Sequence, residues 1–187
     1  TMNPSTEEIC GASARVHAKH IFILPNNSNI IMAAQQAAAV TEDKDVIVLE
    51  TKSVTQGLSA CISFNPDATV EENIEAMSEA IANVKTGQVT YAVKDTSMNG
   101  VEIHAGDYMG LFDKEIKLTA KDKVEACKGL IKEMIDEDSE IVTLLKGEDA
   151  SEQEVNEVAS YITDNFNVDV DVQDGGQPVY AFIIGVE

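Results

Sequence analysis

Two short apolar runs, separated by a polar loop and a stretch of small apolar residues, constrain most what this chain can fold into. Residues 20–24 are rich in β-branched and aromatic side chains and end at Pro25, which cannot donate to a ladder, so they predict a strand buried on both faces. Ser28 is expected to cap a helix over 29–40, and residues 46–49 predict a second strand. This spacing predicts a parallel βαβ unit with a right-handed crossover.

Polar loops follow both predicted strands, at the carboxyl ends where open α/β sheets place ligands and partners. Short polar side chains before a helix can hold an anion or a carbonyl group, or they can serve only the turn and the helix cap. Both readings stay open here. Gln177, which follows a Gly-Gly turn, is a further candidate. The candidate partner- or ligand-binding residues of the two loops are Asn26, Asn27, Ser28, Thr51, Lys52, Ser53 and Gln56.

The rest of the chain predicts a mixed α/β fold with helices packed on the sheet. Three S/T-x-x-E capping boxes, at Ser5, Thr69 and Ser151, predict helix starts. Between them, residues 88–118 change to the period of two that is typical of antiparallel strands, with Asn99-Gly100 as a type I′ hairpin turn. Residues 140–173 repeat the βαβ pattern, ending in an exposed or edge strand. No long linker interrupts the chain, so residues 1–187 are expected to form a single α/β domain around an antiparallel hairpin insert.

The chain is strongly acidic, with 33 acidic and 13 basic residues and a net charge of −20. This charge argues against binding nucleic acid or anionic lipid, and it is typical either of a simply solvated surface or of a face that docks a basic partner. No apolar run approaches the ~18 residues that membrane insertion requires, and no secretion signal is readable, so a cytoplasmic location is expected. The three widely spaced cysteines are expected to be free thiols.

The sequence contains no recognisable catalytic motif. The chain contains no phosphate-binding loop, no dinucleotide fingerprint and no nucleophile elbow. His104 has no nucleophile in its pattern, and His17 and His20 have no carboxylate or cysteine at ligand spacing. The acidic run 136–138 is read as a solvated helix end, with a metal cluster as the alternative. We therefore predict neither a catalytic residue nor a metal site.

Several phrases together resemble one family, the C-terminal domain of the kinase component of bacterial fatty acid kinase, a dihydroxyacetone kinase-like (DAK2-domain-containing) protein. The resemblance covers nearly the whole chain. The phrases are Thr-Met-Asn-Pro-Ser-Thr-Glu at 1–7, Leu-Pro-Asn-Asn-Ser-Asn-Ile-Ile-Met-Ala-Ala at 24–34, Thr-Lys-Ser-Val-Thr-Gln-Gly-Leu at 51–58, Phe-Asn-Pro-Asp-Ala at 64–68, Gly-Gln-Val-Thr-Tyr-Ala-Val at 87–93, Gly-Asp-Tyr-Met-Gly at 106–110 and Gly-Gly-Gln-Pro-Val-Tyr at 175–180.

The resemblance implies a DegV-like fold and a C-terminal fragment of a multidomain protein, whose absent N-terminal domain binds ATP and magnesium. No cofactor is then expected in this fragment. The implied role is non-catalytic: docking the fatty-acid-binding subunit, so that its bound fatty acid is phosphorylated to acyl phosphate. The alternative is a DegV-like domain with its own fatty acid or small anionic ligand in the crevice. A homodimer through the parent protein is also compatible with the resemblance.

Overall fold

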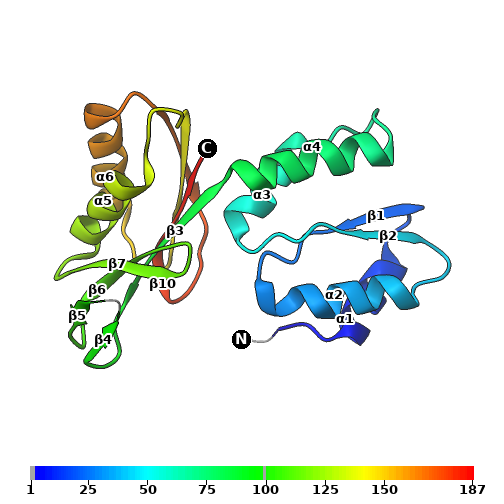
Figure 1. The fold of residues 1–187 in the computed structure, drawn as a ribbon, viewed down its shortest axis with the longest axis horizontal. Helices are drawn as coiled ribbons and strands as arrows, with labels where there is room; N and C mark the ends of the chain where they lie inside the picture. The colour runs from blue at the N-terminus through cyan, green and yellow to red at the C-terminus, as the bar shows by residue number, and fades with distance from the viewer. Residues whose placement is uncertain (1–2, 99) are drawn as a thin grey trace. The chain divides into compact units, whose positions relative to one another are not determined.

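The computed structural model describes residues 3–98 and 100–187, which divide into two compact units, one ending at Val84 and the other beginning at Lys85 (Figure 1). Each unit has its own hydrophobic cluster, and the two are described separately below. The single domain expected from the sequence stays a prediction.

The first unit contains the predicted parallel βαβ arrangement. β1 and β2 pair in parallel, with Ile21 opposite Val46, as expected from the sequence. The capping boxes at Ser5 and Thr69 begin α1 and α4, which confirms both predicted helix starts. The elements of this unit are α1 (Thr6–Arg15), β1 (His20–Ile23), α2 (Ser28–Val40), β2 (Asp45–Val48), α3 (Val54–Ser63) and α4 (Val70–Asn83).

Two local predictions for this unit are wrong. β1 is not buried on both faces: His20 is exposed, and Leu24, just beyond the strand, is only partly buried. The reason is that β1 and β2 form a two-stranded sheet of four residues each, too small to enclose its own strands. Nor does Ser28 cap α2. Asn27 is the N-cap, and Ser28 is the first helical residue. The core of this unit lies instead around Leu49, Ala60 and Met77.

The second unit is built on a six-stranded sheet in the order β7-β6-β3-β10-β8-β9. β8 and β9 pair in parallel around α6, which confirms the second βαβ arrangement and the edge position of β9. The other neighbours are antiparallel, so the antiparallel strands join this βαβ arrangement in one sheet. The elements are β3 (Lys85–Tyr91), β4 (Thr96–Met98), β5 (Val101–Ile103), β6 (Tyr108–Phe112), β7 (Glu115–Ala120), α5 (Lys123–Met134), β8 (Ile141–Lys146), α6 (Glu152–Asn165), β9 (Asp169–Asp174) and β10 (Tyr180–Val186).

The hairpin predicted near residue 100 is present as β4 and β5, which pair antiparallel. Gly100 has a φ of 80°, a conformation that glycine adopts at little cost. Asn99 lies outside the described residues, and so does the predicted type I′ turn that depends on it. The third capping box is confirmed at Ser151, where α6 begins.

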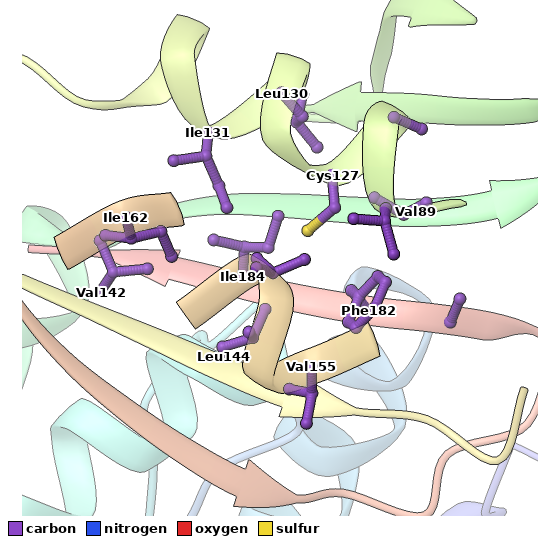
Figure 2. Packing of buried hydrophobic residues seen from close by; sticks show 14 of the residues in the cluster. Val89, Cys127, Leu130, Ile131, Val142, Leu144, Val155, Ile162, Phe182 and Ile184 are labelled. Carbon is purple, nitrogen blue, oxygen red and sulfur yellow. The ribbon is translucent and has the colours of Figure 1, made fainter. Parts of the chain in front are cut away.

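The core of the second unit lies between the sheet and the helices α5 and α6. Phe182 on β10 is opposite Val89 on β3, and Ile184 is opposite Leu144 on β8, so these side chains share one face of the sheet. Figure 2 shows them packed with Cys127 and Leu130 of α5 and Val155 and Ile162 of α6. Burial raises the pKa of the Cys127 thiol, and all three cysteines are free, as predicted.

Two features of the described residues bear on function. No helix in residues 3–98 or 100–187 is long and apolar enough to cross a membrane. In the same residues, no group of three or more His, Cys, Asp or Glu side chains is arranged to hold a metal ion.

Candidate binding site at the strand ends

The structure brings together the first residues of both predicted crevice loops. The backbone N–H of Asn26 donates a hydrogen bond to Oγ1 of Thr51 over 2.9 Å. Thr51 is fully buried, and Asn26 has a φ of 57°, in the left-handed region that Asn tolerates better than most residues. The loops that follow β1 and β2 are thus joined at the carboxyl ends of the strands, as expected for a parallel pair.

The side chain of Asn26 turns toward the start of α3. A β-carbon built on Gly57 would lie 2.1 Å from Oδ1 of Asn26 and 2.7 Å from its Cγ, so glycine is required for this approach. Oδ1 of Asn26 is buried and accepts no hydrogen bond from any described residue. An unpaired buried polar atom is costly, so this oxygen is the most unusual polar group of the site.

Two of the predicted residues serve as helix caps. The side chain of Asn27 accepts a hydrogen bond from the N–H of Asn29 over 3.0 Å. The hydroxyl of Ser53 accepts from the N–H of Gln56 over 3.2 Å, and it lies 3.1 Å from the hydroxyl of Thr55. Both contacts fix helix starts, which is the structural role weighed for these side chains in the sequence analysis.

Of the remaining predicted residues of the first unit, Gln56 holds the loop after β2. Oε1 of Gln56 accepts a hydrogen bond from the N–H of Lys52 over 2.7 Å, and its Nε2 donates to the carbonyl of Ile81 over 3.3 Å. The Lys52 side chain is exposed, whereas Ser28 is half-buried in the first turn of α2. Gln56 therefore ties α3 both to the loop and to α4.

Gln177 belongs to the second unit. Its Nε2 donates to the carbonyl of Leu145 over 3.0 Å and to that of Tyr180 over 3.3 Å. These bonds close the turn that leads into β10. The structure thus gives Gln177 a local role within the second unit.

Sequence reasoning missed the outward face of α3. Val54, Leu58 and Ile62 recur every four residues and are 41%, 39% and 85% exposed. The inward face carries the small residues Gly57 and Ala60, because the helix lies too close to the Asn26 loop and to the core for larger ones. The apolar spacing was visible in the sequence, but such a stripe ordinarily predicts the buried side of a helix. We call Val54, Leu58 and Ile62 the α3 stripe.

Solved structures with the same fold define the class of protein. A DegV lipid-binding protein of Thermotoga maritima superposes with a TM-score of 0.74 at 13% identity, over 99% of this chain and 76% of that one. The Streptococcus pneumoniae fatty acid kinase B3 protein, loaded with linoleic acid, superposes with a TM-score of 0.72 at 17% identity, over 98% of this chain and 76% of that one. The chain therefore has the DegV-family α/β fold, as predicted.

The sequence places the chain more narrowly. The model of the FakA-like C-terminal family, which is the C-terminal region of one fatty acid kinase component and its relatives, matches residues 1–187, and the chain belongs to this family. The YloV protein of Bacillus subtilis is 47% identical over 188 residues, which cover all of this chain and 34% of that protein. The chain thus spans about a third of the length of the curated relatives that it matches.

Proposed function

We propose that this chain is a non-catalytic docking domain of a fatty acid kinase, and that it binds the fatty-acid-binding subunit through the α3 stripe beside the strand-end loops. In this role it holds the subunit so that the ATP-binding part of the parent protein converts the bound fatty acid to an acyl phosphate. Membership of the FakA-like C-terminal family supports a role in fatty acid phosphorylation. The docking role itself is our proposal.

This proposal rests on one observation: the larger apolar side chains of α3 lie on its exposed face rather than on its buried face. The helix contains no charged residue, in a chain where 25% of residues are charged, and its larger apolar side chains face outward. Exposed apolar groups that gather on one element are typical of protein–protein contacts. Ser53, which caps this helix, follows the buried Thr51, so the stripe starts at the strand-end loops.

The proposal assigns the chemistry to other parts of the parent protein. ATP and magnesium are expected in the N-terminal domain, where the family resemblance locates them. This chain supplies positioning, which is a large part of phosphoryl transfer because the reaction depends on alignment and on charge stabilisation. We place the complex in the cytoplasm, where ATP is available.

A binding titration with three variants tests the proposal. The 187-residue chain should bind the fatty-acid-binding subunit from the same genome, and Leu58→Ser and Ile62→Ser should each weaken the Kd by about tenfold, a loss of about 1.4 kcal/mol. Met32→Ser is the matched control, because Met32 is an apolar side chain that is 70% exposed on a different helix, α2. Its Kd should stay within about threefold of the wild type.

Two outcomes would contradict this proposal. The first is a wild-type chain that shows no binding to the subunit. The second is equal binding by the two α3 variants and by Met32→Ser, which would leave docking possible but remove the α3 stripe from it. Circular dichroism of each variant checks that the helices remain folded.

One observation favours a second candidate function, a ligand site of the domain's own. Oδ1 of Asn26 is buried at the strand ends and accepts no hydrogen bond from a described residue, so it has capacity for one from the O–H of a protonated fatty acid, whereas a carboxylate has no hydrogen to donate. Solved proteins of the same fold carry bound fatty acids, and linoleic acid in the S. pneumoniae B3 protein is one case. Calorimetric titration of this chain with free fatty acid distinguishes the two functions, and Asn26→Gly should abolish any heat of binding.

A further inference from the structure

A second surface of the molecule contains a groove. It lies within the second unit, between the loop that joins α5 to β8 and the loop that joins α6 to β9, and its volume is about 870 Å³. Three half-buried apolar side chains, Ile135, Phe166 and Val168, line it and also pack against the core; we call them its apolar floor, and the other eight lining residues are polar. We call this the β8–β9 groove.

The rim of the groove is acidic. Glu137, Glu140 and Asp169 line it, are exposed, and form no ion pair with any described residue. No Lys, Arg or His belongs to its lining. Three unpaired carboxylates around a common hollow repel one another, so a cation that enters the groove gains attraction to all three and relieves that repulsion.

The fourth carboxylate of the rim shows how an ammonium group binds here. Asp136 is paired with Nζ of Lys85, which also donates to the carbonyl of Met134 over 3.4 Å. The hydrogen bond from Lys85, together with one from Ser139, holds the pKa of the Asp136 carboxyl below its usual range. The wall of the groove therefore already holds one lysine of the chain by a carboxylate and a backbone carbonyl.

We propose that the β8–β9 groove docks a lysine- or arginine-bearing segment of the fatty-acid-binding subunit. The apolar floor suits the aliphatic stem of such a side chain, and the acidic rim suits its charged head. The identity of the partner rests on the function proposed above, whereas the cationic chemistry rests on the groove. A single metal ion fits less well, because no three potential ligands among the described residues are grouped to hold one.

The negative charge of the groove and of the chain argues against other classes of occupant. Anionic lipid and nucleic acid would both be repelled by the rim, and by a chain that carries −20 overall. A purely apolar helix would bury the three rim carboxylates without partners, at a cost that the small floor does not offset. A basic protein segment is the occupant that satisfies both parts of the groove.

The test compares two sets of neutralised carboxylates that change the net charge equally. One variant carries Glu137→Gln, Glu140→Gln and Asp169→Asn in the groove. Its control carries Glu71→Gln, Glu75→Gln and Glu79→Gln on the exposed face of α4, three glutamates that also lack an ion pair with a described residue. The Kd for the fatty-acid-binding subunit should rise at least about tenfold in the groove variant and less than about threefold in the control.

Salt provides a second readout. The dependence of the Kd on salt should be weaker in the groove variant than in the wild type, because fewer ion pairs remain to be screened. Equal Kd values and equal salt dependence for the groove variant and the α4 control would overturn this inference while leaving the docking function intact. Failure of the wild-type chain to bind the subunit would overturn both. A charge-reversing single variant, Glu137→Lys, gives an independent measurement if the triple variant unfolds.

Discussion

The side chain of Asn26 occupies the space that a β-carbon on Gly57 would need. Asn26 lies in the loop after β1 and Gly57 in the first turn of α3, and such a β-carbon would lie 2.1 Å from Oδ1 of Asn26. This contact sets how closely α3 approaches the strand ends. It therefore links the strand-end loops to the position of the α3 stripe.

Gly57→Ala should destabilise the protein even though alanine is the better helix former. The new methyl group collides with Asn26, and overpacking of this kind costs typically 1–3 kcal/mol, whereas replacing a helical glycine gains about 1 kcal/mol. We expect a net loss of up to about 2 kcal/mol in the free energy of unfolding, measured by denaturant titration.

Gly11→Ala is the matched control, because Gly11 lies within α1 and a β-carbon there would meet only the end of the Arg15 side chain, at 3.9 Å. This substitution should stabilise the protein by about 0.5–1 kcal/mol. If the two substitutions shift stability in the same direction, the approach of Asn26 to Gly57 is not a close one in solution.

Local signals in the sequence were sufficient for three of the helix starts. The capping boxes at Ser5, Thr69 and Ser151 are each formed by residues three positions apart, so their geometry depends on little else. The parallel pairing of β1 with β2 followed from the length of the crossover between them. These features are decided within a short segment of chain.

Whether a strand or a helix face is buried depends on the elements that pack against it, and the sequence of a single segment does not specify these neighbours. Residues 20–24 have the composition of a central strand, but β1 belongs to a two-stranded sheet and stays partly exposed. The last strand, β10, has a similarly apolar composition, but it lies between β3 and β8 and is buried along almost its whole length. The α3 stripe has the spacing of a core face, and only the close approach of Gly57 to Asn26 explains why it faces outward.

The two cores should differ in sensitivity to truncation. Phe182→Ala removes a fully buried ring from the core of the second unit and should cost about 3–5 kcal/mol. Leu24→Ala removes a side chain that is only partly buried, so we expect a loss below about 2 kcal/mol. Denaturant unfolding followed by circular dichroism measures both changes. A larger loss for Leu24→Ala than for Phe182→Ala would mean that β1 is more enclosed than the structure indicates.

Glu72 should make stability depend on pH in acid. Its carboxylate accepts hydrogen bonds from the backbone N–H and the hydroxyl of Thr69, which lower its pKa in the folded state. The resulting stabilisation is present above the unfolded-state pKa of about 4.3, and it is lost as pH falls through the lower, folded-state value. The thermal midpoint of the wild type should therefore fall in acid relative to that of Glu72→Gln, whose amide does not titrate.

Glu75→Gln controls for the loss of one negative charge on the same helix, because the exposed Glu75 side chain takes no part in the capping box. Thermal unfolding of the three proteins from pH 7 to pH 3 gives the comparison. A constant difference between the wild type and Glu72→Gln across this range would show that the capping carboxylate does not contribute as a charged group.

Cys61 offers a direct probe of the α3 stripe, because it is exposed on the same helix between Leu58 and Ile62. In the free chain Cys61 should react fastest with a maleimide, whereas Cys127 should react only on unfolding, since it is fully buried and burial raises the pKa of its thiol. If the stripe docks the fatty-acid-binding subunit, a saturating amount of that subunit should slow the labelling of Cys61 at least about tenfold. Mass spectrometry of the labelled peptides separates the sites, and Cys61→Ser identifies the fast one. Unchanged labelling of Cys61 in a complex that demonstrably forms would mean that the subunit binds elsewhere on the domain.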